Sequence, residues 1–178
     1  MTAPEKAGLS VRKVGPEAVP LIRRLADVAF PATYRDILSP GQLAYMMDWM
    51  YAEASLLRQM EQEGHVYFVA ESDGEPCAYV SVQPRGLQEE GDLLFELQKI
   101  YVLPSFQGRG IGRQLYAQVC RFVRDAAGNR PCRIELHVNR QNPAVDFYRH
   151  LGMEILREGD FPIGNGYYMN DYIMGVSL

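Results

Sequence analysis

The residues best suited to chemistry form a short glycine-rich segment, Gln107 to Gly112, which reads Q-G-R-G-I-G. The run before it, Leu93 to Leu103, is rich in Leu, Ile, Val, Phe and Tyr and predicts a strand that stops at Pro104. After it, apolar residues recur at helical spacing from Ile111 to Ala126. A glycine-rich turn that leads into a helix lets backbone N–H groups approach a phosphate, and the helix N-terminus adds unpaired donors and the positive end of the dipole. The segment is therefore a candidate pyrophosphate site; the alternative is a glycine-rich helix start without a ligand.

The spacing of the glycines excludes two common phosphate motifs. Gly108, Gly110 and Gly112 are spaced G-x-G-x-G, so the dinucleotide fingerprint G-x-G-x-x-G does not fit. The P-loop pattern does not fit either, because no lysine followed by serine or threonine occurs in the segment. The pattern that does fit is Q-x-x-G-x-G.

Two further segments accompany this pattern in a fixed order. Glu96 to Pro104 reads E-L-Q-K-I-Y-V-L-P before the glycines, and Asn139 to Met153 reads N-R-Q-N-P-A-V-D-F-Y-R-H-L-G-M after them. Together the three segments resemble the GNAT superfamily of N-acetyltransferases. The resemblance implies an α/β fold, with a mixed, mostly antiparallel central sheet flanked by helices, and acetyl-CoA as cosubstrate.

The resemblance also implies which residues bind acetyl-CoA. Those residues are Ile100, Tyr101, Val102, Gln107, Gly108, Arg109, Gly110, Ile111, Gly112, Asn139, Asn142 and Tyr148. For Asn139 and Asn142 an alternative is open, because asparagine also caps turns and helix starts. Asn142 is followed by Pro143, which suits the first position of a helix.

The order of periodic segments predicts a single mixed α/β domain over residues 1–178. The strands are expected at Leu9 to Val14, Val66 to Glu71, Pro76 to Val82, Leu93 to Leu103, Arg133 to Val138, Met153 to Arg157 and Tyr167 to Val176. Helices are expected at Pro16 to Phe30, around Leu43 to Met50, around Leu56 to Met60, from Ile111 and after Asn142, with a loop from Pro31 to Pro40. The Asp73-Gly74 pair predicts a hairpin turn between the second and third strands.

Composition narrows the range of partners. With 47% hydrophobic and 22% charged residues the chain resembles an ordinary globular protein, and its net charge of −4 argues against nucleic acid as the main partner. The three cysteines lack metal-ligand spacing, so we expect buried free thiols and no metal site. Met1 to Leu9 lacks an apolar signal-peptide core, and no run reaches membrane-spanning length. We therefore expect a cytoplasmic protein without a membrane partner, with a homodimer as one option.

Acetyl transfer to an amine needs a route for a proton. A primary amine of pKa ~10.4 is mostly ammonium at pH 7, and freeing its lone pair costs ~4.6 kcal/mol. Glu96 is the candidate base, because strand alternation predicts it on one face with Gln98, Ile100 and Val102, an unusual apolar setting for a carboxylate. In the resembled family a glutamate four positions before the first residue that meets the pantetheine arm is a recurrent base, and Glu96 stands four before Ile100. The alternative is a glutamate at a sheet edge, solvated or paired with a cation.

The leaving thiolate needs a donor, and Tyr148 is the candidate. Ala144, Phe147, Tyr148 and Leu151 share one face of the predicted helix, which carries the phenol inward. A phenol of pKa ~10 is a weak acid towards a thiolate of pKa ~8.5, so hydrogen bonding to developing charge is expected rather than early proton transfer. The alternative is a buried tyrosine that only packs.

The acceptor is less well specified. Five acidic residues lie in segments expected near the mouth of the cleft: Glu89, Glu90, Asp92, Asp160 and Asp171. They favour a cationic amine as the acceptor. The alternative is that they are solvated loop charges. Aromatic side chains could shape either a small-amine or a peptide pocket: Tyr34, Tyr167 and Tyr168. The histidines have no serine, cysteine or carboxylate at motif spacing, so no catalytic triad is predicted.

These observations lead to one interpretation and two alternatives. We expect an N-acetyltransferase that moves acetyl from acetyl-CoA to a primary amine, small amine or polyamine, by direct transfer in a ternary complex. No cysteine has the spacing that a covalent acetyl-enzyme would need. The alternatives are acetylation of protein N-termini or lysines, and a non-catalytic acyl-CoA-binding regulatory module.

Overall fold

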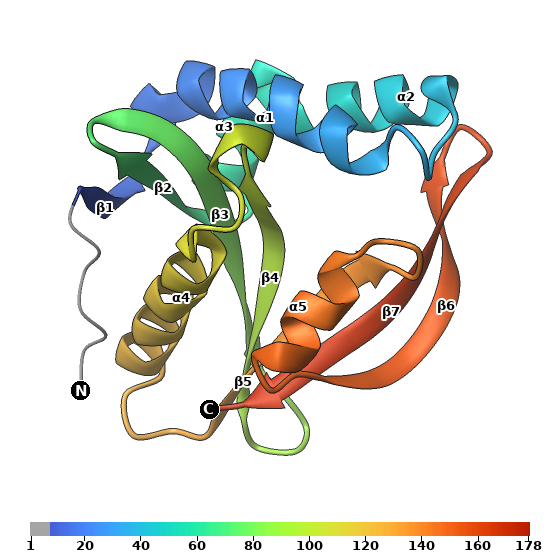
Figure 1. Ribbon diagram of the computed structural model, residues 1–178. Helices are drawn as coiled ribbons and strands as arrows, with labels where there is room; N and C mark the ends of the chain where they lie inside the picture. The colour runs from blue at the N-terminus through green and yellow to red at the C-terminus, as the bar shows by residue number, and fades with distance from the viewer. Residues whose placement is uncertain (1–7) are drawn as a thin grey trace.

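The computed structural model describes residues 8–178 (Figure 1). Residues 1–7, which belong to the stretch expected not to form a signal peptide, lie outside the described residues. Within residues 8–178, seven strands form one sheet in the order β1-β2-β3-β4-β5-β7-β6. The strands are β1 (Leu9–Val14), β2 (Val66–Ser72), β3 (Glu75–Leu87), β4 (Leu93–Val102), β5 (Cys132–Asn139), β6 (Glu154–Gly164) and β7 (Tyr167–Ser177). The helices are α1 (Val19–Tyr34), α2 (Pro40–Tyr51), α3 (Glu53–Glu61), α4 (Ile111–Ala127) and α5 (Ala144–His150), with short 3-10 turns at Pro16–Ala18 and Pro104–Phe106.

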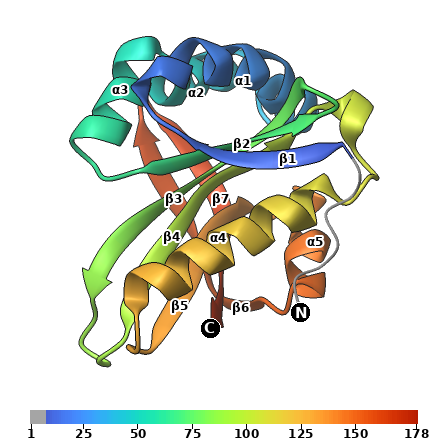
Figure 2. The ribbon, with the colours of Figure 1, turned by 90° about the vertical axis from the view of Figure 1, so that its left-hand side faces the viewer.

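The predicted fold class is confirmed. Every strand pair is antiparallel except β4 with β5. Helices α1 to α3 pack on one face of the sheet, and α4 and α5 lie on the other (Figures 1 and 2). Each face therefore has its own apolar core, as expected for a sheet whose strands alternate between two buried layers. Within the described residues, no helix is both long and apolar enough to cross a membrane.

The first helix is longer than predicted, because it continues through Pro31 to Tyr34. Proline has no N–H and normally ends a helix, which is why a loop from Pro31 was expected. Here Phe30 and Tyr34 lie one turn apart on the buried face, with ring centroids 4.7 Å apart. The Arg35 N–H donates to the Pro31 carbonyl at 2.9 Å, so the last turn closes in spite of the proline. Packing of two aromatic rings against the sheet thus outweighs the local cost of Pro31.

Two strands also extend beyond their predicted ends, and both contain a proline. Strand β3 continues to Leu87 through Pro84, and β6 continues to Gly164 through Pro162. A proline cannot donate to a strand neighbour, so it is tolerated only along an unpaired edge or at a bulge. The pairing of β2 with β3 stops at Val82, β6 is the outermost strand, and both prolines adjoin register shifts. The sequence alone could not show that these edges are unpaired.

A lysine is buried under the helices that cover the first face. Lys99 is 6% exposed, and its Nζ donates to Gln59 Oε1 at 2.5 Å and to the Tyr67 hydroxyl at 2.6 Å. Burial lowers the pKa of Lys99 to about 7, and the charge of Glu63 opposes that shift. The Tyr67 hydroxyl also donates to Gln59 Oε1 at 2.6 Å, a bond that does not need the lysine.

The lowered pKa of Lys99 makes a prediction about stability. Between about pH 10 and pH 7 the unfolded chain binds a proton that the folded chain does not, so the lysine destabilises the fold progressively as pH falls through this window. As pH falls from 10 to 7, the free energy of unfolding of the parent should therefore drop relative to that of Lys99→Met, by an amount on the order of a few kcal/mol. Urea unfolding at the two pH values measures this, with the exposed Lys13→Met as control. A parent and a Lys99→Met variant with the same pH dependence would contradict it.

Candidate active site

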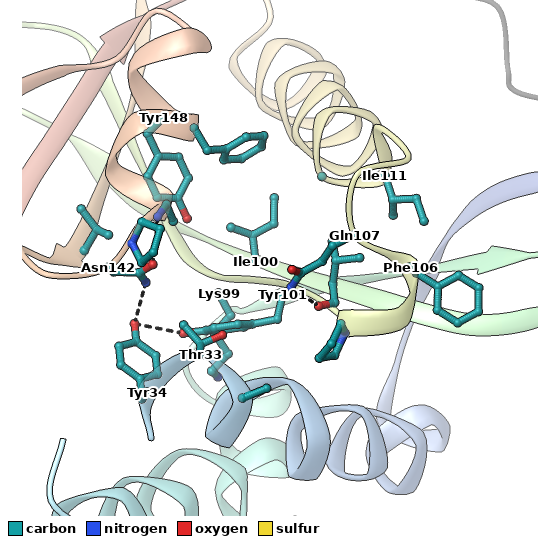
Figure 3. A pocket seen from close by; sticks show the side chains of 18 of the residues that line it. Thr33, Tyr34, Lys99, Ile100, Tyr101, Phe106, Gln107, Ile111, Asn142 and Tyr148 are labelled. Atoms are coloured by element: carbon teal, nitrogen blue, oxygen red, sulfur yellow. Dashed lines mark hydrogen bonds between the residues drawn. The ribbon is translucent and has the colours of Figure 1, made fainter. Parts of the chain in front are cut away.

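A cleft of about 860 Å³ lies where β4 and β5 separate (Figure 3). Its size is within the range of small-ligand sites. Five parts of the chain contribute to its wall: the end of α1, the second half of β4, the glycine-rich segment with the start of α4, two residues of β5, and the segment from Asn142 into α5. The glycine-rich segment therefore faces a cavity large enough for an extended ligand.

The cleft exists because two strands pair along only part of their length. Strands β4 and β5 are in parallel register only from Leu93 to Glu96, opposite Cys132 to Glu135. Beyond Glu96, β4 keeps β3 on one side, and no other strand among residues 8–178 pairs with its second edge. Peptide groups from Leu97 to Val102 line the opening, where an extended ligand bearing amides can bind as an added strand would.

The glycine-rich segment has the backbone conformation that the motif requires. Gly108 and Gly110 both have φ of +78°, which side chains other than glycine rarely adopt. Gly110 is the N-cap of α4, and the first internal bond of this turn runs from the Gln114 N–H to the Gly110 carbonyl at 3.2 Å. The first-turn residues from Ile111 on line the cleft, and their N–H groups have no helical partners. An anion at this place would also meet the positive end of the helix dipole.

Two neighbouring side chains stabilise this segment. Gln107 Nε2 donates to the Val102 carbonyl at 3.2 Å and ties the segment back to β4. Gly112 lets the Phe147 ring pack against α4, since a Cβ there would lie 3.2 Å from Phe147 Cζ. The resulting contact holds α5 beside the start of α4.

A substitution at the N-cap tests the segment. Gly110→Val should weaken acetyl-CoA binding at least ~10-fold, because a branched side chain strains the positive φ and blocks close approach of the pyrophosphate. Isothermal calorimetry measures the affinity, and circular dichroism checks the fold. Gly74→Val is the matched control: Gly74 has φ of +82° in the β2–β3 turn, far from the cleft in sequence and absent from its wall. Equal losses in both variants, or none in Gly110→Val, would contradict the assignment.

Asn142 joins α5 to the end of α1. Its Oδ1 accepts from the Ala144 N–H at 2.9 Å and caps α5, as the alternative from the sequence predicted. Its Nδ2 donates to the Tyr34 hydroxyl at 3.3 Å, and the Tyr101 hydroxyl donates to the same oxygen at 3.4 Å (Figure 3). All three residues line the cleft, so Asn142 both caps a helix and forms part of the wall.

Tyr148 projects from α5 into the cleft (Figure 3). It is 7% exposed, and burial raises its pKa above the usual range for a phenol, with a smaller contribution from Tyr34. The phenol therefore keeps its proton at any pH where the protein would be assayed. A protonated hydroxyl in this position can donate a hydrogen bond to charge that develops on a ligand.

Glu96 lies on a different face of β4 than predicted. One extra residue, Gln98, interrupts the pairing of β4 with β3, since Lys99 is opposite Ser81 while Leu97 is opposite Val82. Such a bulge reverses the alternation, so side chains beyond it change faces. Ile100 and Val102 pack with the core under α4, whereas Glu96 shares the opposite face with residues beyond the bulge such as Lys99. The expected apolar setting of Glu96 was therefore wrong.

The actual surroundings of Glu96 are polar. Its carboxylate lies 3.6 Å from Arg85 Nε and 3.9 Å from His137 Nε2, and its side chain is 23% exposed. His137 lines the cleft and Glu96 does not. The carboxylate thus stands directly behind one wall of the cleft, at the end opposite the glycine-rich segment.

Two residues expected to bind the cosubstrate do not line the cleft. Asn139 Oδ1 accepts from the Gln141 N–H at 2.9 Å, which is the turn-capping alternative. Arg109 stacks on Phe106, with Cζ 4.9 Å from the ring centroid, and donates to the Ser105 carbonyl at 3.2 Å. The other ten expected residues are part of the wall: Ile100, Tyr101, Val102, Gln107, Gly108, Gly110, Ile111, Gly112, Asn142 and Tyr148.

The acidic residues separate into two groups. Asp92 and Glu90 pair with Arg133, and Asp160 pairs with Arg140, so these carboxylates are already in ion pairs with arginines. Asp171 is different, since it is only 6% exposed and its Oδ2 lies 3.6 Å from His137 Nδ1. Among the described residues, no group of three or more metal-binding side chains has the geometry to hold an ion.

Sequence reasoning missed the role of His137 and the residues next to Tyr34. Thr33 and Arg35 line the cleft only because α1 continues through Pro31. His137 lies between two carboxylates from other strands, and no spacing in the sequence predicts that arrangement. The alternation of β5 gave no signal either, because His137 continues the polar face of Arg133 and Glu135 opposite the apolar residues of the strand.

Comparison with known proteins agrees with the geometry. The family model for an acetyltransferase (GNAT) domain matches residues 63–154. An uncharacterized N-acetyltransferase of Escherichia coli K12, YjgM, is 29% identical over 160 residues, covering 86% of this chain and 91% of that protein.

Two solved structures have a similar fold. The PaiA N-acetyltransferase from Thermoplasma acidophilum, in complex with coenzyme A, has a TM-score of 0.73 at 20% identity and covers 96% of this chain and 99% of its own. A mutant of the spermidine N-acetyltransferase SpeG from Vibrio cholerae has a TM-score of 0.64 at 18% identity and covers 97% and 95%. At these identities the likeness concerns the fold and carries no argument about the acceptor. The match over residues 63–154, which contain the cleft's glycine-rich segment and both candidate catalytic residues, shows that the chain belongs to the GNAT family and is an acetyl-CoA-dependent N-acetyltransferase.

Proposed function

We propose that this enzyme acetylates the primary amine of a small molecule, a small amine or polyamine, by direct attack on acetyl-CoA in a ternary complex. The observation that carries the proposal is the arrangement of the cleft. One end has the glycine-rich segment Gly108 to Gly112 at the start of α4, and at the other His137 lines the cleft with the carboxylates of Glu96 and Asp171 next to it. A cosubstrate and a cationic acceptor can therefore meet from opposite ends.

The cosubstrate is proposed to lie along β4. Its pyrophosphate binds the N–H groups at the start of α4, and its pantetheine arm follows the unpaired edge from Leu97 to Val102. This places the thioester near Tyr148, the hydroxyl of which donates to the sulfur as the C–S bond breaks. Asn142 contributes to the wall beside it.

Direct transfer is favoured by the positions of the cysteines. Cys77, Cys120 and Cys132 are free and buried, and none lines the cleft. Burial raises the pKa of Cys77 and of Cys120, which makes both poor nucleophiles. The amine lone pair therefore attacks the thioester carbonyl itself, and Glu96 belongs to the route by which the ammonium proton leaves. Free thiols also favour the reducing cytoplasm as its location.

A screen of acceptors tests the proposal. The enzyme with acetyl-CoA is offered monoamines, polyamines, an N-terminal peptide and a lysine peptide, and released CoA thiol is measured. We expect turnover with small amines to exceed that with either peptide. Preference for a peptide would overturn the acceptor class, and acetyl-CoA binding without turnover on any amine would favour the non-catalytic alternative.

A further inference from the structure

Three side chains from different strands form a chain at the acceptor end of the cleft. Asp171 of β7 lies 3.6 Å from His137 Nδ1, and His137 Nε2 lies 3.9 Å from Glu96 Oε1. The Phe161 ring packs against the imidazole in a T-shaped arrangement, with centroids 5.0 Å apart. The imidazole is therefore held with one nitrogen towards a buried carboxylate and the other towards a carboxylate that is 23% exposed.

Asp171 has few partners apart from this imidazole. It is 6% exposed, and its Oδ1 has no hydrogen-bond partner among the side chains and backbone of residues 8–178. A buried carboxylate is costly unless a cation or a donor compensates it. The distance of 3.6 Å between His137 Nδ1 and Asp171 Oδ2 is longer than a hydrogen bond, so a proton on Nδ1 compensates Asp171 by charge attraction; it leaves the lone pair of the neutral ring on Nε2.

Access distinguishes His137 from Glu96. The histidine side chain is 40% exposed and lines the cleft, whereas Glu96 lies behind it. An ammonium nitrogen that makes hydrogen bonds of roughly 2.8–3.0 Å can reach two acceptors 3.9 Å apart at once. The separation of His137 Nε2 and Glu96 Oε1 thus matches a primary amine nitrogen that contacts both acceptors.

Resting on the proposed function, we propose that His137 is a catalytic residue that takes the acceptor's proton, and that Asp171 is a positioning residue that holds its tautomer. The N–H bond of the ammonium breaks, the proton binds to Nε2, and the freed lone pair attacks the thioester carbon. The resulting imidazolium is stabilised between Asp171 and Glu96, and the proton leaves to solvent through the exposed side of the ring.

Other charged groups bear on the pH dependence of this step. From neighbouring strands, Glu96 and Asp171 face the ring directly, and Arg85 of β3 lies 3.6 Å from Glu96. On β5 itself, Glu135 shares the face of His137. The carboxylate of Glu135 lies 3.4 Å from Arg157 Nη1 of β6. Burial raises the pKa of the Tyr34 phenol, with a smaller contribution from the charge of Asp171, so Tyr34 stays neutral.

The kinetic test uses the pH dependence of kcat/KM for the best amine from pH 6 to 10. His137→Gln should lower kcat/KM at pH 7 by roughly 10²-fold or more, because it removes the group that takes the proton. The deficit should shrink as pH approaches the pKa of the free amine. Asp171→Asn should move the acidic limb of the profile to lower pH, a change that lost packing alone would not cause. His150→Gln, an exposed histidine on α5, is the matched control and should follow the parent.

A second measurement does not depend on activity. In the ¹⁵N spectrum of the intact protein at pH 9, neutral His137 should be the Nδ1–H tautomer. The Nε2–H tautomer would overturn the proposal, because that nitrogen could not accept a proton. So would a His137→Gln profile identical to the parent's, or a deficit that stays constant with pH. If the parent binds acetyl-CoA but acetylates no amine, the proposed function itself fails; if only the His137 results fail, acetyl transfer to an amine stands without this relay.

Discussion

Tyr148→Phe should lower kcat by roughly 10²–10³-fold while the affinity for acetyl-CoA changes little. The substitution keeps the ring that α5 packs into the cleft and deletes only the hydroxyl. Negative charge on the leaving sulfur develops mainly in the transition state, so a donor that meets it there contributes to the rate and not to binding of the ground state. The expected loss corresponds to ~2.7–4 kcal/mol of transition-state stabilisation.

The pH profile and the leaving group sharpen this test. Because burial raises the pKa of Tyr148 above its usual range, the phenol stays protonated, and the effect of the substitution should not fade between pH 8 and 10. An acyl donor with a more acidic thiol should rescue the variant in part, since its thiolate needs less stabilisation. Tyr116→Phe is the control, a buried tyrosine of α4 that does not line the cleft. If Tyr148→Phe raised only the Michaelis constant for the amine, the Tyr148 hydroxyl would bind the acceptor and not the leaving thiolate.

Glu96→Gln should lower kcat/KM for the amine by ~10²-fold or more at pH 7. Glutamine keeps the shape of the side chain but removes its basicity and its charge, so neither the ammonium proton nor an imidazolium at His137 is stabilised. The loss should shrink as pH rises towards the pKa of the amine, because the acceptor then deprotonates by itself. Initial rates of CoA release between pH 6 and 10 measure both effects.

The chain provides a close control for Glu96. Glu71 is also a strand glutamate, its side chain is also 23% exposed, and it pairs with Arg12 as Glu96 pairs with Arg85. Glu71→Gln removes one surface ion pair and should leave turnover unchanged, because such pairs contribute little. If both variants behaved alike, Glu96 would be a structural partner of Arg85 and nothing more.

The local parts of the site could be predicted from sequence because neighbours in the chain determine them. The positive φ of Gly108 and Gly110 depends on the absence of a Cβ, and the start of α4 follows from apolar residues at helical spacing. The cap on α5 is equally local, since Asn142 reaches a backbone N–H two residues away. For the same reason, three ordered segments were enough to identify the family and its fold class.

The pairing of β4 with β3 determines which face of the sheet each side chain of β4 occupies. Alternation along one strand predicts faces correctly only while its pairing is regular, and the extra residue at Gln98 becomes visible only opposite Ser81 and Val82. Glu96 was therefore found as a candidate from its spacing, but its neighbours were predicted wrongly. The continuation of α1 through Pro31 has a similar origin, because the rings of Phe30 and Tyr34 gain more by packing on the sheet than the helix loses at the proline.

The sequence by itself determined the candidate phosphate-binding segment from residue types at short spacing, and its resemblance to the GNAT superfamily implied the acetyl-CoA chemistry and supported the two candidate catalytic residues. Only the tertiary structure decided that β4 and β5 separate after Glu96 and that His137 lies between Glu96 and Asp171. The physical reason is that the three side chains belong to strands β4, β5 and β7, whose order in the sheet differs from their order in the chain. Distances between such residues depend on strand register, which long-range packing sets and no single segment encodes.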